Sequence, residues 1–375
     1  MKREIQYDIL KILCMFSVIG IHIGGAFFYS WDSYDSFITT YYQQHVFFSS
    51  FFACGLRFAV PCFIMISGAF LLDQAKNKNY RTFYYHIFRK IGIPTILFSF
   101  LYTIYYIFMA MHETKVAGLP YSSNLKGILW EPVKALLAGV PSYHMWYLYM
   151  MIGIIILTPW LIRLKDEIGE ASFRKVAIVF LILAMCSNFT AHYFFRWDIG
   201  YSFTYLGYYM IGYCIRKHSS QKTNWWKASV SFVLALLILG GVSYVKSQEV
   251  MHIITLHLTN GVEDYYSPFI VAASLLIFYG TSQLVFVSKP MKLSSYALWI
   301  YIIHYGVWDI TRRVIVRYFD VTTMDNRIAI PCLILGVFVI TLLLSKIYLV
   351  VWNAIDKKWH VTDRWSKWLS PTTIS

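Results

Sequence analysis

The chain has 375 residues, of which 58% are hydrophobic and 14% are charged, and its mean hydropathy is +0.53. A soluble domain carries about 25% charged residues, so this composition excludes an ordinary water-soluble globular protein. The net charge of +14 comes from Lys and Arg in short clusters between apolar runs. A nucleic-acid-binding protein would carry one continuous basic face, so we interpret the charge as a sign of membrane topology and expect no nucleic-acid partner.

The six cysteines all fall within apolar stretches, with no Cys-x-x-Cys pair and no His-x-His companion. This pattern favours neither a disulfide framework nor a zinc site. We predict that the cysteines are small buried hydrophobic residues and that the protein holds no metal.

Ten apolar runs are long enough to cross a bilayer, whose core of about 30 Å needs about 20 apolar residues per helix. The segment at 125–140 is too polar to span, and we expect an interfacial or re-entrant helix there. The predicted fold is therefore all-α, a single membrane domain over 1–375. Its expected transmembrane helices are 8–28, 47–72, 85–110, 145–162, 174–192, 200–216, 227–247, 267–286, 295–316 and 328–352.

The basic residues divide unequally between the two sets of connecting loops. One set, which includes both termini, holds 21 Lys and Arg, whereas the other holds 9. Cytoplasmic loops carry the excess, so both termini are predicted to be cytoplasmic. The first apolar run lacks a small-residue cleavage site and contains Lys11 and His22, which indicates a helix of the mature protein and not a signal peptide.

Three Lys or Arg remain outside both sets of loops: they are Lys11, Arg57 and Lys346. A charge near the membrane centre costs at least about 2.5 kcal/mol, so each needs a partner, a cavity or a nearby interface. Lys346 is close to a helix end and can extend to the interface. Arg57 lies about ten residues into the second helix, beside small residues, and we expect it to face a polar cavity.

Lys11 and His22 lie on one face of the first predicted helix. Eleven residues advance a helix by about 1100°, only about 20° beyond three turns, and by about 16 Å along its axis. One face therefore carries a cation at the inner end and a titratable base deep in the membrane. Asp8, three residues before Lys11, is a candidate partner for it.

Five sequence elements, in this order, resemble the acyltransferase family 3 membrane proteins. The first is the Lys11 to His22 stretch of the first helix, where the family has an Arg followed by a His. The others are Val60–Gly68 with Leu71-Leu72, Arg89–Pro94, His144–Tyr149 with Thr158-Pro159, and Tyr301-Ile-Ile-His304. The similarity covers essentially the whole chain. Lys11 departs from the usual Arg: it keeps the charge but lacks the planar guanidinium that binds a phosphate bidentately.

The resemblance implies transfer of an acyl group, often acetyl, from cytoplasmic acyl-CoA to a hydroxyl of a cell-surface polysaccharide or lipid-linked glycan. It also implies a multi-pass protein of a bacterial plasma membrane. An extended pantetheine arm is long enough, in order of magnitude, to join the inner end of the Lys11–His22 face to its deeper end. Assembly into a homo-oligomer stays open.

Under this resemblance, His22 is the expected general base, since imidazole titrates near pH 6.5. A structural role for His22 and a covalent acyl-histidine intermediate are the alternatives. Lys11, Arg89 and Lys90 are expected to contact the CoA phosphates, because Lys and Arg are the usual phosphate partners. Ser67 is a further candidate donor contact, with close helix packing by Ser67-Gly68 as the alternative.

The remaining candidates concern the acceptor. Arg57, His304, His144 and Trp146 are expected substrate contacts, although Trp146 is also typical of an interfacial anchor. Asp309, five residues after His304, is expected to pair with Arg312 or Arg313. Carboxylates that could orient His22 are Asp32, Asp35, Glu113 and Asp198, and the sequence does not choose among them.

Two other classes of protein compete with an enzyme. A transporter or flippase of a glycan precursor would also have ten helices with buried charges, but the sequence shows no matched halves with paired Gly/Pro interruptions. A sensor or scaffold has only the lack of a soluble domain in its favour.

Overall fold

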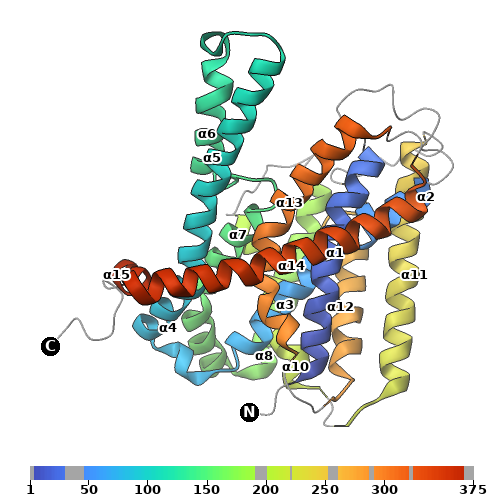
Figure 1. Cartoon of the computed structure of the whole chain (residues 1–375). Helices are drawn as coiled ribbons and strands as arrows, with labels where there is room; N and C mark the ends of the chain where they lie inside the picture. Colours follow the sequence, from blue (N-terminus) through green and yellow to red (C-terminus); the bar gives the residue numbers. More distant parts are fainter. Residues whose placement is uncertain are drawn as a thin grey trace. The chain divides into compact units, whose positions relative to one another are not determined.

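The computed structural model describes residues 4–29, 46–190, 201–219, 222–251, 261–286, 291–320 and 324–366. All regular elements of these ranges are helical, which confirms the all-α fold class (Figure 1). The chain divides into two compact units, one of Met1–Gln74 with Arg163–Tyr348 and one of Ala75–Ile162 with Leu349–Ser375. The boundary between Ile162 and Arg163 falls within α8 (Thr158–Thr190), and the boundary between Tyr348 and Leu349 falls within α14 (Asn326–Trp359).

The first unit contains the candidate general base. Its elements are α1 (Ile5–Tyr29), α2 (Val46–Ser50), the π-helix η2 (Phe51–Gly55), α3 (Ala59–Leu71), most of α8, α9 (Tyr201–Thr204), α10 (Leu206–Lys217), α11 (Trp225–Val250), α12 (Pro268–Ser282), the 3₁₀-helix η7 (Lys292–Tyr296), α13 (Ala297–Tyr318) and most of α14. Each predicted apolar run in this unit contains a helix.

The second unit contains the 75–162 insertion and the C-terminal segment. Its elements are η3 (Ala75–Lys78), α4 (Tyr80–Ile87), the π-helix η4 (Phe88–Gly92), α5 (Ile93–Val116), η5 (Tyr121–Asn124), η6 (Lys126–Trp130), α6 (Glu131–Leu137), α7 (Trp146–Ile156) and α15 (Val361–Ser366). Helix α6 lies along α5 (Figure 1). The predicted non-spanning helix at 125–140 is therefore η6 with α6.

Local sequence signals account for several helix ends. The Asn224 side chain accepts a hydrogen bond from the Lys227 main-chain N–H at 3.0 Å and caps α11. Proline occupies the first turn of α5, α6 and α12, where its missing N–H costs nothing. Gly169, with φ 79°, breaks α8 at a backbone conformation that other residues rarely adopt. This break falls in the predicted loop between the 145–162 and 174–192 helices.

Five helical segments of the described chain are long and apolar enough to cross a membrane. They are 5–28, 46–71, 80–116, 225–249 and 326–359, and a sixth span results if α7 and α8, bent by 44°, count as one. Helix α12 is apolar but short. On α11, Val233 and Leu237 are more than half exposed, as expected of a face toward lipid. These findings establish a membrane protein with several apolar helices.

The second predicted helix is not a single α-helix. The chain passes from α2 through a turn of π-helix and a break at residues 56–58 before α3 begins. The predicted span over 47–72 is found at 46–71, although three helical elements make it up. Such π-helical turns occur frequently at functional sites, and this one brings Arg57 to the break.

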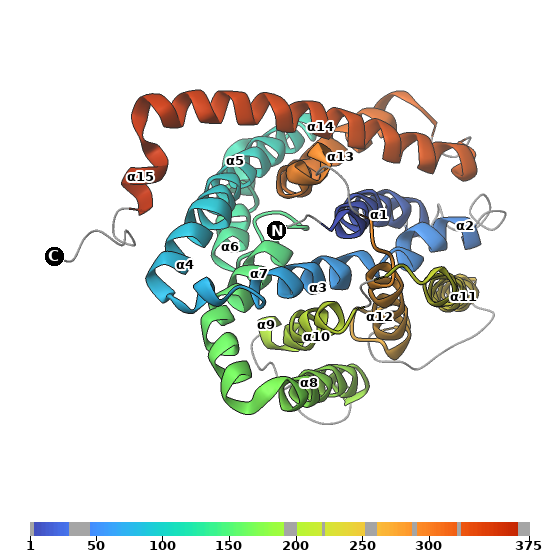
Figure 2. The same ribbon diagram turned by 90° about the horizontal axis from the view of Figure 1, so that it is seen from below.

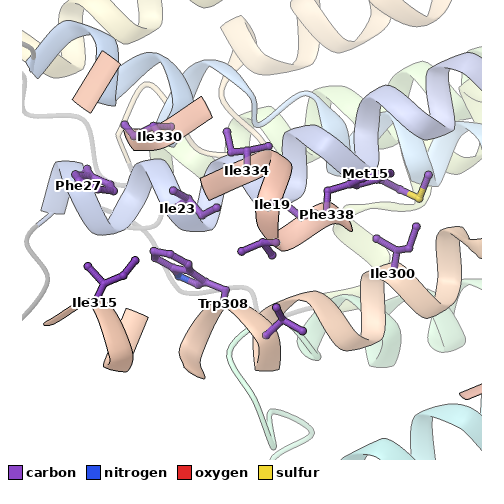
Figure 3. Close-up of a cluster of buried hydrophobic side chains, with 12 residues drawn as sticks. Met15, Ile19, Ile23, Phe27, Ile300, Trp308, Ile315, Ile330, Ile334 and Phe338 are labelled. Carbon is purple, nitrogen blue, oxygen red and sulfur yellow. The ribbon is translucent and has the colours of Figure 1, made fainter. Parts of the chain in front are cut away.

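The core of the first unit is a cluster of apolar side chains on α1, α13 and α14 (Figure 3). On α1, the members recur every four residues, which places them on one helical stripe. They are Met15, Ile19, Ile23 and Phe27. Trp308 of α13 and Ile334 of α14 face this stripe. Burial of the stripe fixes the rotation of α1 and so determines which neighbours His22 meets.

Helix α3 packs between α1 and α10, and glycines allow the closest approach (Figure 2). A Cβ atom added at Gly68 would lie 1.8 Å from the Tyr209 carbonyl oxygen, and one at Gly212 would lie 2.2 Å from the Met65 carbonyl oxygen. Main-chain atoms cannot yield as side chains can. The predicted close packing at Ser67-Gly68 is thus confirmed for Gly68.

The cysteine prediction was correct in part. Cys14, Cys54, Cys62 and Cys214 are buried, but Cys186 of α8 and Cys332 of α14 are exposed. Cysteine behaves as a small hydrophobic residue, so it can be exposed on an apolar helix where the helix faces lipid.

Candidate functional site

The candidate general base, His22, lies beside a second histidine. The imidazole rings of His22 on α1 and His304 on α13 have centroids 5.3 Å apart and an interplanar angle of 34°. The ring of Tyr305 meets His22 edge-on, with centroids 5.0 Å apart. His304 is 1% exposed, whereas His22 is only partly buried. The two helices therefore bring two proton-accepting groups to one place.

The main chain of α13 orients His304. Its Nδ1 lies 2.6 Å from the Tyr301 carbonyl oxygen and 3.2 Å from that of Ile300. A carbonyl oxygen only accepts, so Nδ1 carries the hydrogen and donates it. In the neutral ring the lone pair is then on Nε2. The proton-accepting atom of His304 is thus fixed by helix geometry.

Arg57 supplies positive charge to the same site. Its positive charge acts electrostatically on the His22 imidazole. Its guanidinium carbon lies 5.6 Å from the centre of the Tyr265 ring, and its Nε is 3.4 Å from the Ala53 carbonyl oxygen. Arg57 itself lies in the helix break at residues 56–58. That Arg57 faces a polar cavity stays a prediction.

The 261–267 connection forms a wall next to Arg57. Tyr208 donates a hydrogen bond to the Tyr265 carbonyl oxygen at 2.7 Å, and the Thr204 and Tyr266 hydroxyls lie 2.7 Å apart. Burial raises the pKa of the Asp264 carboxyl, although the Tyr266 N–H and the Arg57 charge act in the opposite direction. This connection positions Tyr265 against Arg57.

Lys11 lies three turns of α1 away from His22. Because α1 is unbroken from Ile5 to Tyr29, the predicted common face and separation of about 16 Å both hold. The Lys11 Nζ is 5.7 Å from the centre of the Phe70 ring. Asp8, predicted as a partner of Lys11, accepts a hydrogen bond from the Ser294 hydroxyl at 2.8 Å.

A second cation shares the Phe70 ring with Lys11. The guanidinium carbon of Arg216 lies 4.5 Å from the ring centre, and Arg216 forms ion pairs with Glu4 and, at 2.9 Å, with Asp73. The sequence placed Arg216 among the loop cations and gave no sign of this position. The ion pairs tie the ends of α1, α3 and α10 together at the Lys11 end of the site.

Ser67 donates a hydrogen bond to the Phe63 carbonyl oxygen of its own helix at 3.0 Å. This bond satisfies the hydroxyl locally and agrees with the packing alternative for this pair of residues. A contact with the donor stays a prediction.

Arg89 and Lys90 belong to the second unit. Arg89, on η4, forms an ion pair with Asp363 of α15, and its Nη1 lies 2.5 Å from the Tyr85 hydroxyl. Lys90 is exposed. The guanidinium predicted to meet a phosphate therefore already has an acidic partner from the C-terminal segment.

His144 and Trp146 also belong to the second unit. His144 is 1% exposed, its Nδ1 lies 3.2 Å from the Ser142 hydroxyl, and the Tyr102 ring meets it edge-on with centroids 5.2 Å apart. Trp146 begins α7 and is partly buried. The structure thus shows His144 as a packed, hydrogen-bonded residue, and an acceptor contact for either stays a prediction.

The four carboxylates considered as partners of His22 stay predictions. Asp32, Asp35 and Asp198 lie outside the described residues, and Glu113 belongs to the second unit. Asp309 pairs with both Arg312, at 3.3 Å, and Arg313, at 3.0 Å, as the sequence predicted.

Comparison with protein families connects this geometry to a known class of enzyme. A model of acyltransferase family 3, described as an acyltransferase domain, matches residues 4–346. The chain belongs to acyltransferase family 3. No curated protein and no solved structure matches it.

The matched range of this acyltransferase contains every candidate site residue. Sequence reasoning assigned His304 to the acceptor and missed its contact with His22. The available signal was the pair of membrane-embedded histidines, because polar residues in spanning helices usually face one another or a cavity. Tyr305 and Tyr265 carried no such signal among the chain's 30 tyrosines.

Proposed function

We propose that this membrane acyltransferase moves an acyl group, with acetyl the expected one, from cytoplasmic acyl-CoA to a hydroxyl of a cell-surface polysaccharide or lipid-linked glycan. The observation that carries the proposal is the pair of imidazoles at His22 and His304, with the charge of Arg57 acting on His22. Proton transfer and stabilisation of negative charge are the two needs of acyl transfer from a thioester.

His22 removes the proton of the acceptor hydroxyl while the hydroxyl oxygen attacks the thioester carbonyl carbon. The carbonyl oxygen gains negative charge, which Arg57 stabilises. When the tetrahedral intermediate collapses, the carbon–sulfur bond breaks, and the CoA sulfur takes the proton from the imidazolium. The ester and CoA thiol leave, and His22 is neutral again. His304 can receive a proton only on Nε2, so it gives the site a second acceptor beside His22.

The donor extends along α1 in this proposal. Lys11 contacts the CoA phosphates at the inner membrane surface, and the pantetheine arm covers the distance of about 16 Å to His22. The arrangement needs both termini in the cytoplasm, and it includes ten membrane crossings in a bacterial plasma membrane. No observation favours the transporter alternative over an acyltransferase.

The test is acyl transfer by purified protein in lipid, with acetyl-CoA and a candidate glycan, followed by mass spectrometry of the glycan. His22→Ala is expected to lower the rate by about 10²–10⁴-fold, the usual contribution of a general base. His112→Ala, at an exposed position of α5, is the matched control and should retain activity. Near-normal transfer by folded His22→Ala protein would refute the assignment.

A further inference from the structure

A second site lies on another face of α1. It is a pocket of about 380 Å³ between α1, the η2 segment, α11 and α12. Its lining is almost wholly apolar, with Leu10 and Leu13 of α1, Phe51 of η2, Leu236 and Leu239 of α11 and Ile277 of α12. Engineered apolar cavities of about 150 Å³ stay dry and bind benzene, so a pocket of this size accommodates a much longer hydrocarbon.

The pocket is separate from the proposed donor path. Leu10, Leu13 and Ser17 recur at helical spacing and line it from one face of α1. His22 follows Ser17 by five residues, which rotates it by about 140° around the helix. The Lys11–His22 face therefore points elsewhere, and the pocket is not where the acyl-CoA arm runs.

Two of the three polar side chains in the lining are hydrogen-bonded within the protein, and the third is Ser17. Thr281 donates to the Ile277 carbonyl oxygen at 2.8 Å, and the Gln6 side-chain oxygen accepts from the Phe286 N–H at 3.5 Å. A polar ligand would gain little here, whereas a hydrocarbon chain would bury its surface against apolar walls.

The depth of the pocket indicates where such a chain comes from. Trp225 and Trp226 at the start of α11 are 63% and 79% exposed, as is typical of residues at a membrane interface. The α11 residues that line the pocket, from Phe232 to Leu239, lie about 10–21 Å along the helix from Trp225. This is the depth of lipid acyl chains.

The mouth of the pocket opens toward lipid. Ile9 and Leu13 on α1 are 46% and 48% exposed, and Leu236 on α11 is 57% exposed, although all three line the pocket. We propose that the pocket binds one acyl chain of a membrane phospholipid, from the leaflet that contains the N-terminal ends of α1 and α11. The chain enters sideways from the bilayer between these two helices.

A bound chain contacts the segment that carries Arg57. Gly55, Leu56 and Phe58 form one wall of the pocket, and Arg57 lies between them in sequence. The lipid therefore packs against the helix break in which Arg57 lies. Lipid binding itself does not depend on the proposed enzymatic function.

The test uses protein in vesicles of phosphatidylethanolamine and phosphatidylglycerol that contain a trace of phosphatidylglycerol with a photoreactive diazirine in its acyl chain. After illumination, mass spectrometry locates the cross-links. We expect them to concentrate on the pocket segments of α1 and α11. Leu236→Trp fills the pocket and should lower these cross-links about tenfold, because the apolar space is removed. Leu237→Trp, on the adjacent lipid-facing position, should leave them unchanged.

Leu13→Trp is a second filling variant, in case Leu236→Trp does not fold. Equal cross-linking in the parent, the filling variant and the Leu237→Trp control would overturn the proposal, as would labelling spread evenly over all lipid-facing positions. Both results would show general annular lipid only. Since the readout is a cross-link, failure of the acyltransferase proposal would not alter it.

Discussion

The imidazole rings of His22 and His304 lie 5.3 Å apart, although one is on the first helix of the described chain and the other is on α13. The Tyr301 carbonyl accepts the hydrogen of His304 Nδ1, so Nε2 is the nitrogen of this ring that can accept a proton. Two histidines that act on one proton should show coupled effects when they are replaced.

His304→Ala is expected to lower the rate of acyl transfer by less than His22→Ala does. The double variant should transfer acyl groups only slightly more slowly than His22→Ala alone, because His304 accepts a proton only by way of His22. Rates of all three variants give a coupling energy, expected at about 0.5–3 kcal/mol for residues in contact. Strictly additive losses would mean that His304 acts elsewhere.

Arg57→Ala is expected to lower kcat by about 10²–10³-fold, the cost of losing one group that stabilises the oxyanion. Arg57→Lys should keep part of the activity because it keeps the charge, though not the planar group beside Tyr265. Steady-state kinetics decide between this role and simple binding. A rise in KM with unchanged kcat would mean that Arg57 binds the acceptor equally in the ground state and the transition state, and does not stabilise the oxyanion specifically.

Lys11→Ala is expected to raise the KM for acyl-CoA with a smaller change in kcat, and Lys11→Arg should keep or improve activity. Thermal unfolding gives a second readout, since a ligand at a hundredfold excess over Kd stabilises by about 2.7 kcal/mol. Lys346→Ala, an exposed lysine within α14, is the matched control. If Lys11→Ala leaves both KM and the CoA-dependent shift intact, Lys11 only reaches the membrane surface.

Gly68→Ala is expected to destabilise the first unit by about 1–3 kcal/mol or more, because the new methyl group meets the Tyr209 main chain. Gly241→Ala on α11 is the control: no atom lies within 4 Å of its added Cβ, so the helix should gain about 0.5–1 kcal/mol. Unfolding in detergent measures both. Equal melting temperatures for the two variants would contradict the packing of α3 on α10.

The predicted orientation is tested with single added cysteines in whole cells stripped of wall. Ser122→Cys, in the connection before α6, should react with an impermeant thiol reagent, and Ser219→Cys should not. The parent protein gives the baseline for its six native cysteines. The opposite labelling pattern would place the Lys11 end of α1 outside the cytoplasm.

Features that depend on neighbouring residues along the chain followed from the sequence. Apolar runs located the helices, and the 100° turn per residue placed Lys11 and His22 on one face of α1, because rise and rotation are properties of the helix itself. Gly68 was assigned to helix packing for a similarly local reason: a residue without a side chain marks a close approach.

Only the tertiary structure decided which of these faces meet. The stripe from Met15 to Phe27 binds α1 to α13 and α14, and this packing rotates His22 toward His304. The π-helical turn before Arg57 and the ion pair of Arg89 with Asp363 were likewise invisible in the sequence. Helical periodicity specifies the direction of a side chain relative to its own axis. Its partner depends on how long-range apolar packing brings separate helices together.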